Sequence, residues 1–317
     1  MKTRILPLLL AAAFSLSGCQ VLPTFSKPRP PVPQAFAAPV AENAPAAADI
    51  GWRDFFRNPE LQAAIALALD NNRDLRTAAL RIEEARALYG IQRADQLPTV
   101  NATGGATSSR QLFRGQPFES TVYLVGLGMT AFELDFFGRV KNLSDAALAQ
   151  FFATEEARRS AQIALVGEVA KAWLSERALA EQVLIAERTL KARQSSFDLV
   201  KQRFDAGVAN ALELRQGETL VQSARVSSLA LQRQHAQSVN ALTLLTGSGT
   251  PLPAQGATLS AQVITADIGA GLPSDLLASR PDIRAAEQRL RANQANIAAA
   301  RAAFFPRISL TAAIGLA

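Results

Sequence analysis

The chain has 317 residues, of which 49% are hydrophobic and 19% charged, and its formal net charge is +6. This length and apolar content suffice for one or two folded domains and exclude intrinsic disorder as the default. Lysine and arginine alternate with glutamate along helical stretches instead of forming one basic run, which argues against a nucleic-acid-binding surface. Aromatic residues make up only 6% of the chain, so we expect long helices packed through small side chains.

Residues 1–18 have the features of a signal peptide. Lys2 and Arg4 precede an apolar stretch, residues 5–14, that is too short to span a bilayer. Residues 16–19 read Leu-Ser-Gly-Cys, which resembles the bacterial lipobox, where cleavage before the cysteine is followed by its acylation. Cys19 is the only cysteine, so no disulfide can form within the chain. We expect lipidation at Cys19; the alternative is an incidental cysteine in an ordinary secretory signal.

Residues 19–50 are rich in proline and alanine and cannot form a packed core. We expect an extended tether between the lipid anchor and the folded part. Gln20 follows the cysteine where an aspartate would favour retention in the inner membrane, so sorting to the outer membrane is the preferred interpretation.

Residues 51–96 predict two helices, a short one over 60–69 and a longer one over 74–94 that Pro98 brings to an end. Residues 97–135 then change to strand-like character, rich in Thr, Val, Gly and Ser. We expect two strands over 99–113 and 121–134, joined by a turn at residues 114–117.

The second of these strands alternates in character. One face carries the larger apolar residues, and the residues between them are smaller or more polar: Tyr123, Val125, Leu127, Met129 and Ala131 against Leu124, Gly126, Gly128 and Thr130. This pattern is expected when one face meets lipid and the other a lumen. A soluble sheet packed against a helix gives the same alternation, and the strand alone does not decide between the two.

Residues 136–247 predict a long antiparallel helical hairpin. No proline interrupts residues 139–205, and a helix of that length would extend roughly 100 Å at 1.5 Å per residue. Its latter part has apolar residues at heptad spacing, interrupted by Glu176 and Arg193, which requires a partner helix. Gly207 is suited to end the first helix and Asn210 to cap the second, which runs to about residue 246.

A loop over residues 248–273 leads to a copy of an earlier segment. Residues 74–103 align without gaps to residues 282–311, a shift of 208 positions (282 minus 74), and both copies run from a helix through a proline into a strand. Chance is a poor explanation for a match of this length. Residues 274–317 are therefore the start of a second repeat that stops inside a strand at Ala317. We expect a truncated chain that lacks roughly a third of the protein.

With these features the chain resembles the TolC/OprM family of outer membrane efflux factors, in the lipoprotein branch associated with RND pumps. The resemblance covers about residues 52–317. It rests on residues 52–56 and 71–84, on the strand-to-helix segment Phe-Glu-Leu-Asp-Phe-Phe-Gly-Arg at 132–139, on Arg-Phe-Asp-Ala-Gly-Val-Ala at 203–209, and on Arg-Pro-Asp-Ile-Arg at 280–284.

This resemblance implies an α+β membrane protein in which the long helical hairpin forms part of a coiled-coil tunnel. It also implies a homotrimer in which each subunit gives four strands to a transmembrane, 12-stranded β-barrel. The chain would be the outer membrane channel of a tripartite efflux system, a passive export duct for drugs or other small solutes. It would be anchored in the cell outer membrane, in contact with outer membrane lipids, and extend into the periplasm.

The resemblance further implies that Gly207, Val208 and Ala209 dock a periplasmic adaptor protein, which in turn joins an inner membrane RND pump. At Gly207 the simpler explanation is turn geometry, and both roles are compatible. Two alternatives remain open: a periplasmic adaptor, which would have short soluble β-modules beside its hairpin, and a structural coiled-coil lipoprotein, which would not conduct solutes.

Catalytic and metal chemistry find little support in the sequence. His235 is the only histidine, and with one histidine and one cysteine neither a zinc site nor a Cys/His dyad can be built. We expect His235 to be a packed or solvated helix residue. Glu83-Glu84 and Glu155-Glu156 are expected to be surface charges. We therefore predict no enzyme, no cofactor and no nucleic-acid partner.

Overall fold

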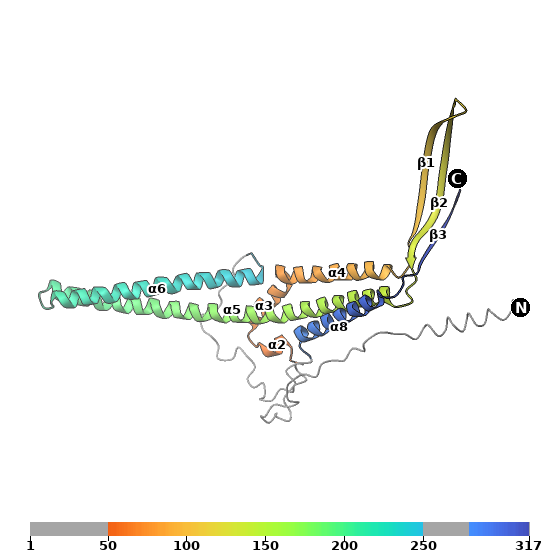
Figure 1. Ribbon diagram of the computed structural model, residues 1–317. Helices are drawn as coiled ribbons and strands as arrows, with labels where there is room; N and C mark the ends of the chain where they lie inside the picture. Colours follow the sequence, from red (N-terminus) through yellow and green to blue (C-terminus); the bar gives the residue numbers. More distant parts are fainter. Residues whose placement is uncertain (1–49, 250–278, 317) are drawn as a thin grey trace, which may run out of the picture. The chain divides into compact units, whose positions relative to one another are not determined.

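The computed structural model of the protein describes residues 50–249 and 279–316, so Cys19 and the tether lie outside the described residues. Its described elements, in chain order, are α2 (Trp52–Phe55), α3 (Pro59–Asn71), α4 (Arg73–Ala94), β1 (Val100–Phe113), β2 (Gln116–Glu133), α5 (Arg139–Asp205), α6 (Ala211–Thr246), α8 (Pro281–Ala302) and β3 (Ser309–Leu316) (Figure 1).

These elements form two units. The strand unit contains residues 80–157 and 281–316, and the hairpin unit contains residues 50–79, 158–249 and 279–280. Helices α4 and α5 each contribute residues to both.

The core of the hairpin unit lies where α3 meets α5 and α6. Leu61 and Ile65 of α3 and Val169 of α5 are completely buried there, and Trp173 and Leu242 pack into the same cluster. Helix α3 begins with Asn58, whose side-chain oxygen accepts hydrogen bonds from the amides of the next turn, and with Pro59 in the first helical position. Both are typical of a helix N-terminus.

The C-terminal end of α6 is fixed to the turn between α3 and α4. The side-chain amide of Asn72 donates to the Leu245 carbonyl (2.9 Å), while its oxygen accepts from the Leu75 amide (2.9 Å). Gly247 ends α6 with a left-handed backbone (φ +62°). A Cβ at Gly247 would lie 2.6 Å from the Asn71 carbonyl oxygen, so only glycine fits at this contact.

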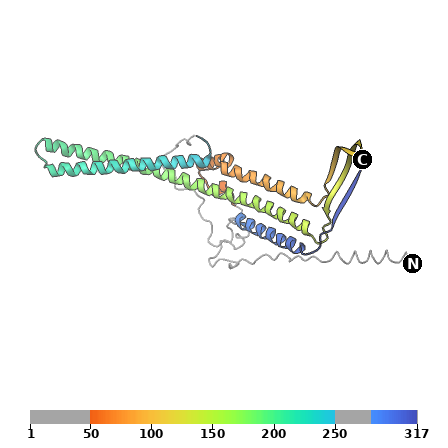
Figure 2. The ribbon, with the colours of Figure 1, turned by 45° about the horizontal axis from the view of Figure 1, so that its top comes forward.

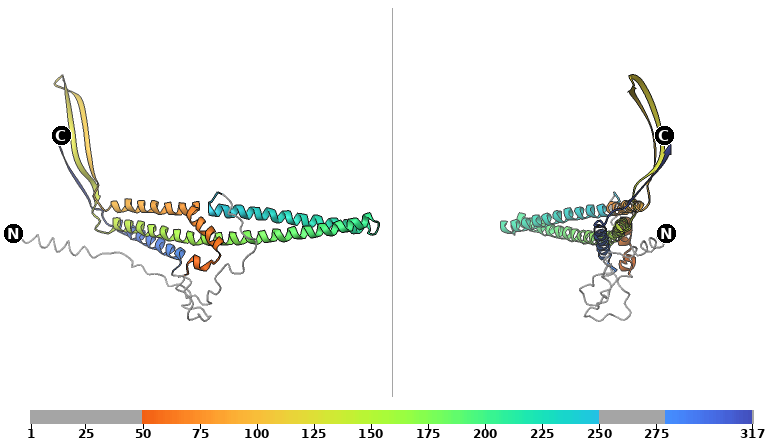
Figure 3. Two further views of the ribbon diagram at one scale, coloured as in Figure 1. Left: turned by 180° about the vertical axis from the view of Figure 1, so that it is seen from behind. Right: turned by 45° about the vertical axis from the view of Figure 1, so that its right-hand side comes forward.

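The hairpin itself matches the sequence prediction closely. In Figures 1, 2 and 3, α6 runs antiparallel beside the second half of α5. At the tip, Gly207 is left-handed (φ +75°) and the side chain of Asn210 accepts from the Glu213 amide (2.9 Å), as predicted. Within the pair, a Cβ at Gly217 would lie 3.2 Å from the Phe197 ring, so a glycine in α6 lets the two helices approach.

The strand unit confirms the internal repeat. Helices α4 and α8 are both 22 residues long, and their first residues, Arg73 and Pro281, are related by the predicted shift of 208 (281 minus 73). Each is followed by a proline and a strand, β1 or β3. The two strands lie on opposite sides of β2 in a three-stranded antiparallel sheet of order β1-β2-β3.

Two predictions in this unit are wrong in detail. The turn between β1 and β2 has two residues instead of four: Arg114 (φ +52°) and Gly115 (φ +82°) are both left-handed, as in the tight hairpin turn that matches strand twist. Glu156 is not a surface charge, because it is 8% exposed and lies 3.7 Å from Arg284 of α8. Glu83 does lie on the surface, in an exposed pair with Arg86.

Candidate functional site

The sheet has one apolar face and one small or polar face. Partners in an antiparallel pair project to the same side, so the register assigns each residue to a face. The apolar face carries Val100, Ala102, Gly104 and Ala106 of β1, Tyr123, Val125, Leu127 and Met129 of β2, and Leu310, Ala312, Ile314 and Leu316 of β3. The other face carries Asn101, Thr103, Gly105 and Thr107 of β1, Val122, Leu124, Gly126 and Gly128 of β2, and Ser309, Thr311, Ala313 and Gly315 of β3.

Large apolar side chains on this face are exposed to an unusual degree. Tyr123 is 69% exposed, Val125 66% and Ile314 78%. Large apolar side chains gathered on one exposed face are costly in water and mark a contact with lipid or with another protein. No residue of the described chain covers it, since every described residue of β3 is exposed as well.

A β-bulge extends the apolar face toward α5. Met129 pairs with Ala312 and Phe132 with Leu310, so three residues of β2 advance against two of β3. Ala131 occupies the bulge with φ +52°, and its amide donates to the hydroxyl of Thr311 (3.3 Å). Phe132 therefore takes the place on the apolar face that the simple alternation gave to Ala131.

Glycines allow β2 and β3 to approach closely. Gly126 and Gly315 are paired across the two strands, and a Cβ at Gly315 would lie 2.7 Å from the Val125 carbonyl oxygen. Gly126 and Gly315 therefore have a role in strand packing.

The β2-to-α5 junction is held by paired charges and aromatic stacking. Arg139, the first residue of α5, donates from Nε to Glu133 (2.8 Å) and from Nη2 to the same carboxylate. This hydrogen-bonded pairing raises the pKa of Arg139, so the guanidinium stays charged. Asp135 accepts from the Lys141 amide (2.7 Å), and the rings of Phe137 and Phe305 stack 4.6 Å apart, which joins the two repeats.

A cluster of charges lies within the hairpin unit where α3, α5 and α6 meet. Arg177 pairs with Glu60 of α3 (3.0 Å) and with Glu176 (3.4 Å), and Glu176 also bonds Nε2 of His235 on α6 (2.8 Å). Glu176 and Arg177 are 6% and 7% exposed. Glu176, which interrupts the heptad pattern, thus exchanges apolar packing for a buried ion pair. His235, which was expected to be packed or solvated, is partly buried and hydrogen-bonded to Glu176.

The predicted docking residues lie together at the hairpin tip. The Gly207 and Val208 amides bond the Phe204 and Arg203 carbonyls (2.9 and 2.8 Å), which closes the last turn of α5. Val208 is 69% exposed, so the tip presents an apolar side chain that contributes nothing to the fold's core.

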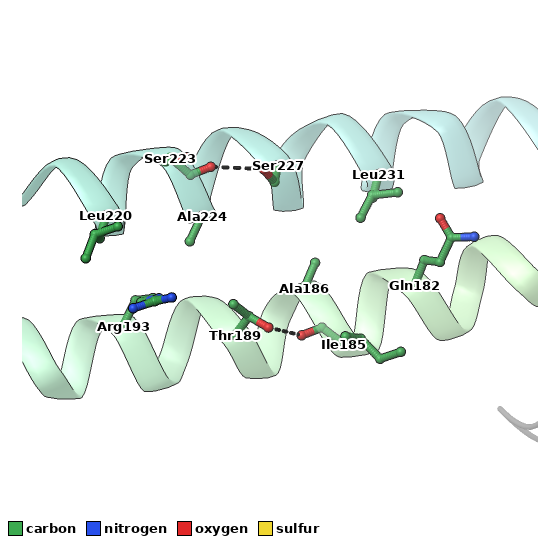
Figure 4. A pocket seen from close by; sticks show the side chains of 10 residues that line it. All are labelled: Gln182, Ile185, Ala186, Thr189, Arg193, Leu220, Ser223, Ala224, Ser227 and Leu231. Atoms are coloured by element: carbon green, nitrogen blue, oxygen red, sulfur yellow. Dashed lines mark hydrogen bonds between the residues drawn. The ribbon is translucent and has the colours of Figure 1, made fainter.

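Below the tip, α5 and α6 enclose a groove with a volume of about 430 Å³ (Figure 4). Figure 4 shows Ala186 on α5 facing Ala224 and Leu231 on α6. Arg193, the second interruption of the heptad pattern, is one of the residues lining this groove. Small side chains on both helices leave the groove open.

No group of three or more metal-ligating side chains occurs within residues 50–249 and 279–316. In that part of the chain, no helix combines the length and the apolarity that crossing a bilayer requires.

Comparison with known proteins assigns a family to this arrangement. The outer membrane efflux protein family matches residues 64–248 and 272–316, which is most of the chain. The chain is 45% identical over 323 aligned positions to the probable efflux pump outer membrane protein TtgC of Pseudomonas putida. The match covers 99% of this chain and 66% of that protein, so the chain spans slightly less than two thirds of the relative's length.

Solved structures have the same fold. A membrane protein from Pseudomonas aeruginosa superposes with a TM-score of 0.81 at 43% identity, over 92% of this chain and 67% of that one. The open state of the MtrE outer membrane channel of Neisseria gonorrhoeae superposes with a TM-score of 0.79 at 37% identity, over 93% of this chain and 66% of the channel.

Proposed function

The chain belongs to the outer membrane efflux protein family, and from this membership we propose that it forms the outer membrane channel of a tripartite, RND-type efflux system. In this role it is a passive duct for drugs or other small solutes, and an inner membrane pump supplies the energy. It performs no catalysis. TtgC and MtrE, named as an efflux pump outer membrane protein and an outer membrane channel, support this proposal.

The two-faced sheet is the observation that carries the proposal. The apolar stripe on β2 from Tyr123 to Phe132 spans about 20–25 Å when strand rise and tilt are taken together, which is close to the height of the apolar band of outer membrane barrels. The three described strands cannot close a cylinder alone, and lipid does not tolerate open strand edges. Further strands are therefore needed for closure, and a trimeric, 12-stranded barrel above a helical tunnel would supply them.

The ends of the molecule have separate roles in this proposal. Residues 1–18 direct export, and Cys19 carries the acyl chains that hold the N-terminus in the outer membrane through the tether at residues 19–50. Intact mass of the protein from membranes tests this: the mature chain begins at Cys19 with added acyl mass, and Cys19→Ser abolishes the addition. An unmodified Cys19 in the membrane-bound protein would contradict it.

The hairpin tip is the proposed docking site for the helical hairpin of a periplasmic adaptor, through Gly207, Val208 and Ala209. A photo-cross-linking amino acid at Val208 tests this in cells. Val226 on α6 is the matched control, because it is 67% exposed against 69% for Val208 and lies away from the tip. We expect adducts to the adaptor from position 208 and none from position 226; equal adducts from both positions refute tip docking.

Transport is tested by accumulation of a fluorescent pump substrate in the source cells. Loss of the gene is expected to raise dye accumulation to the level seen when the inner membrane pump is poisoned. Val208→Asp is expected to raise it as well, because a charge replaces the exposed apolar contact at the tip. Unchanged accumulation after loss of the gene refutes a role in efflux.

A further inference from the structure

A second groove lies at the strand-to-helix junction, in the strand unit. It has a volume of about 350 Å³, and apolar side chains from the end of β2, the following turn and the first turn of α5 line it: Phe132, Leu134, Phe136 and Val140. Lys141 also lines it. Phe136 is 65% exposed although it is a large aromatic residue, so one wall of the groove is open to the surroundings.

The groove continues the apolar face of the sheet. Because of the bulge, Phe132 projects to the same side as Met129 and the stripe above it. A more polar groove of the junction shares Phe132, Glu133 and Val140 with it and is otherwise lined by other residues, among them Thr130, Arg139 and Asp95. Leu134 and Phe136 line only the apolar groove, so the apolar stripe continues through Phe132 to these two side chains.

Lys141 is the one cation among the residues that line this groove. The Glu133 carboxylate is occupied by Arg139, and Asp135 accepts the Lys141 backbone amide. The Lys141 side chain is exposed, and within residues 50–249 and 279–316 no hydrogen bond or ion pair engages its ammonium. An apolar groove with a lysine in its lining matches a molecule with an acyl chain and a phosphate.

We propose that this junction groove binds a phospholipid of the surrounding bilayer, with an acyl chain against Phe132, Leu134 and Phe136 and the phosphate at Lys141. The inference rests on the proposed function, which puts the apolar face of the sheet in lipid and α5 in the periplasm. Under that arrangement the groove lies at the level of the inner-leaflet headgroups. The lipid anchors the junction at a fixed depth and covers the exposed ring of Phe136.

The test is quenching of a tryptophan in the groove by phosphatidylglycerol with brominated acyl chains, added to the full chain in detergent micelles. Phe136→Trp is the reporter. The parent chain gives the background, because its two tryptophans, Trp52 and Trp173, both lie in the hairpin unit. Thr130→Trp, in the polar groove, is the control for position, and a brominated alkyl maltoside is the control for a chain without phosphate.

Lys141→Gln is combined with the reporter, and Lys191→Gln, on α5 in the hairpin unit, is the matched loss of a lysine. We expect the brominated lipid to quench the tryptophan at 136 and not the one at 130. We expect Lys141→Gln to raise the half-saturating lipid fraction about fivefold, the loss of one lysine contact at a membrane surface. Lys191→Gln is expected to leave it unchanged.

Equal effects of the two lysine substitutions, or equal quenching by the maltoside, overturn the proposal. Quenching that appears only after Cys19→Ser also overturns it, because the chain's own acyl anchor would then occupy the groove. The proposal is likewise overturned if inorganic phosphate alone displaces the brominated lipid, because the acyl chain would then not be needed for binding. Binding in micelles requires neither an assembled channel nor an adaptor. A negative result here therefore leaves the cross-linking and accumulation experiments to decide the proposed function separately.

Discussion

Replacement of Gly247 by alanine tests how the hairpin is fixed at its base. Two costs add at this position. The left-handed backbone (φ +62°) costs an alanine about 1–2 kcal/mol. The new Cβ would also lie 2.6 Å from the Asn71 carbonyl oxygen and 3.0 Å from its carbon. These are backbone atoms of α3 that cannot rotate away, and such overpacking costs about 1–3 kcal/mol.

Gly249→Ala is the matched control. Gly249 is also left-handed (φ +70°), but nothing lies within 4 Å of a Cβ at this position, so only the backbone cost applies. The free energy of unfolding is measured by urea denaturation and followed by tryptophan fluorescence, because Trp173 is in the core of the hairpin unit and Trp52 packs against it. We expect Gly247→Ala to destabilise this unit by about 2–5 kcal/mol and Gly249→Ala by about 1–2 kcal/mol. Equal losses would show that the contact between α6 and the α3–α4 turn does not hold the hairpin.

Two further predictions concern the sheet and the buried charges. Gly315→Val puts a side chain against the Val125 carbonyl oxygen, so the hydrogen exchange of backbone amides in the β2–β3 ladder should accelerate more than tenfold (about 1.4 kcal/mol). Gly105→Val is the control and should leave this exchange unchanged, because a Cβ at Gly105 meets nothing within 4 Å. Arg177→Met leaves buried Glu176 without its guanidinium partner and should lower the free energy of unfolding of the hairpin unit in urea by about 3 kcal/mol. Arg215→Met is the control and should cost less than about 0.5 kcal/mol, because its partner Glu218 is exposed. Similar costs for the two substitutions would contradict a stabilising role for the buried cluster.

Local patterns allowed most of the elements to be predicted from sequence. Helix α5 was predicted to its end residues because a proline-free run and a heptad repeat depend only on neighbours in the chain. The tip was predicted equally well, since Gly207 and Asn210 are residues with specific conformational or capping preferences. Because residues 282–311 repeat residues 74–103, α8 was expected to resemble α4, and the two helices have the same length. The pairing of β3 with β2 came from the structure.

The errors arose where contacts between distant segments decide the outcome. The bulge at Ala131 is visible only when β3 supplies the register and Thr311 the hydrogen bond to the bulged amide. Glu156 was assigned to the surface because its partner, Arg284, lies more than a hundred residues away. The junction groove was missed for the same reason, as the apolar face passes to Phe132 only through the bulge.

The central claim is that the two faces of the sheet meet different media. Spin labels on single cysteines along β2, in a Cys19→Ser background reconstituted in lipid vesicles, test it most directly, because Cys19 is the only native cysteine. Labels at Val125, Leu127 and Phe132 should be accessible to dissolved oxygen and protected from a water-soluble nickel reagent. Labels at Leu124 and Gly128 should show the opposite. Loss of alternation between the two faces, or a label at Phe132 that behaves like the one at Leu124, would contradict the account.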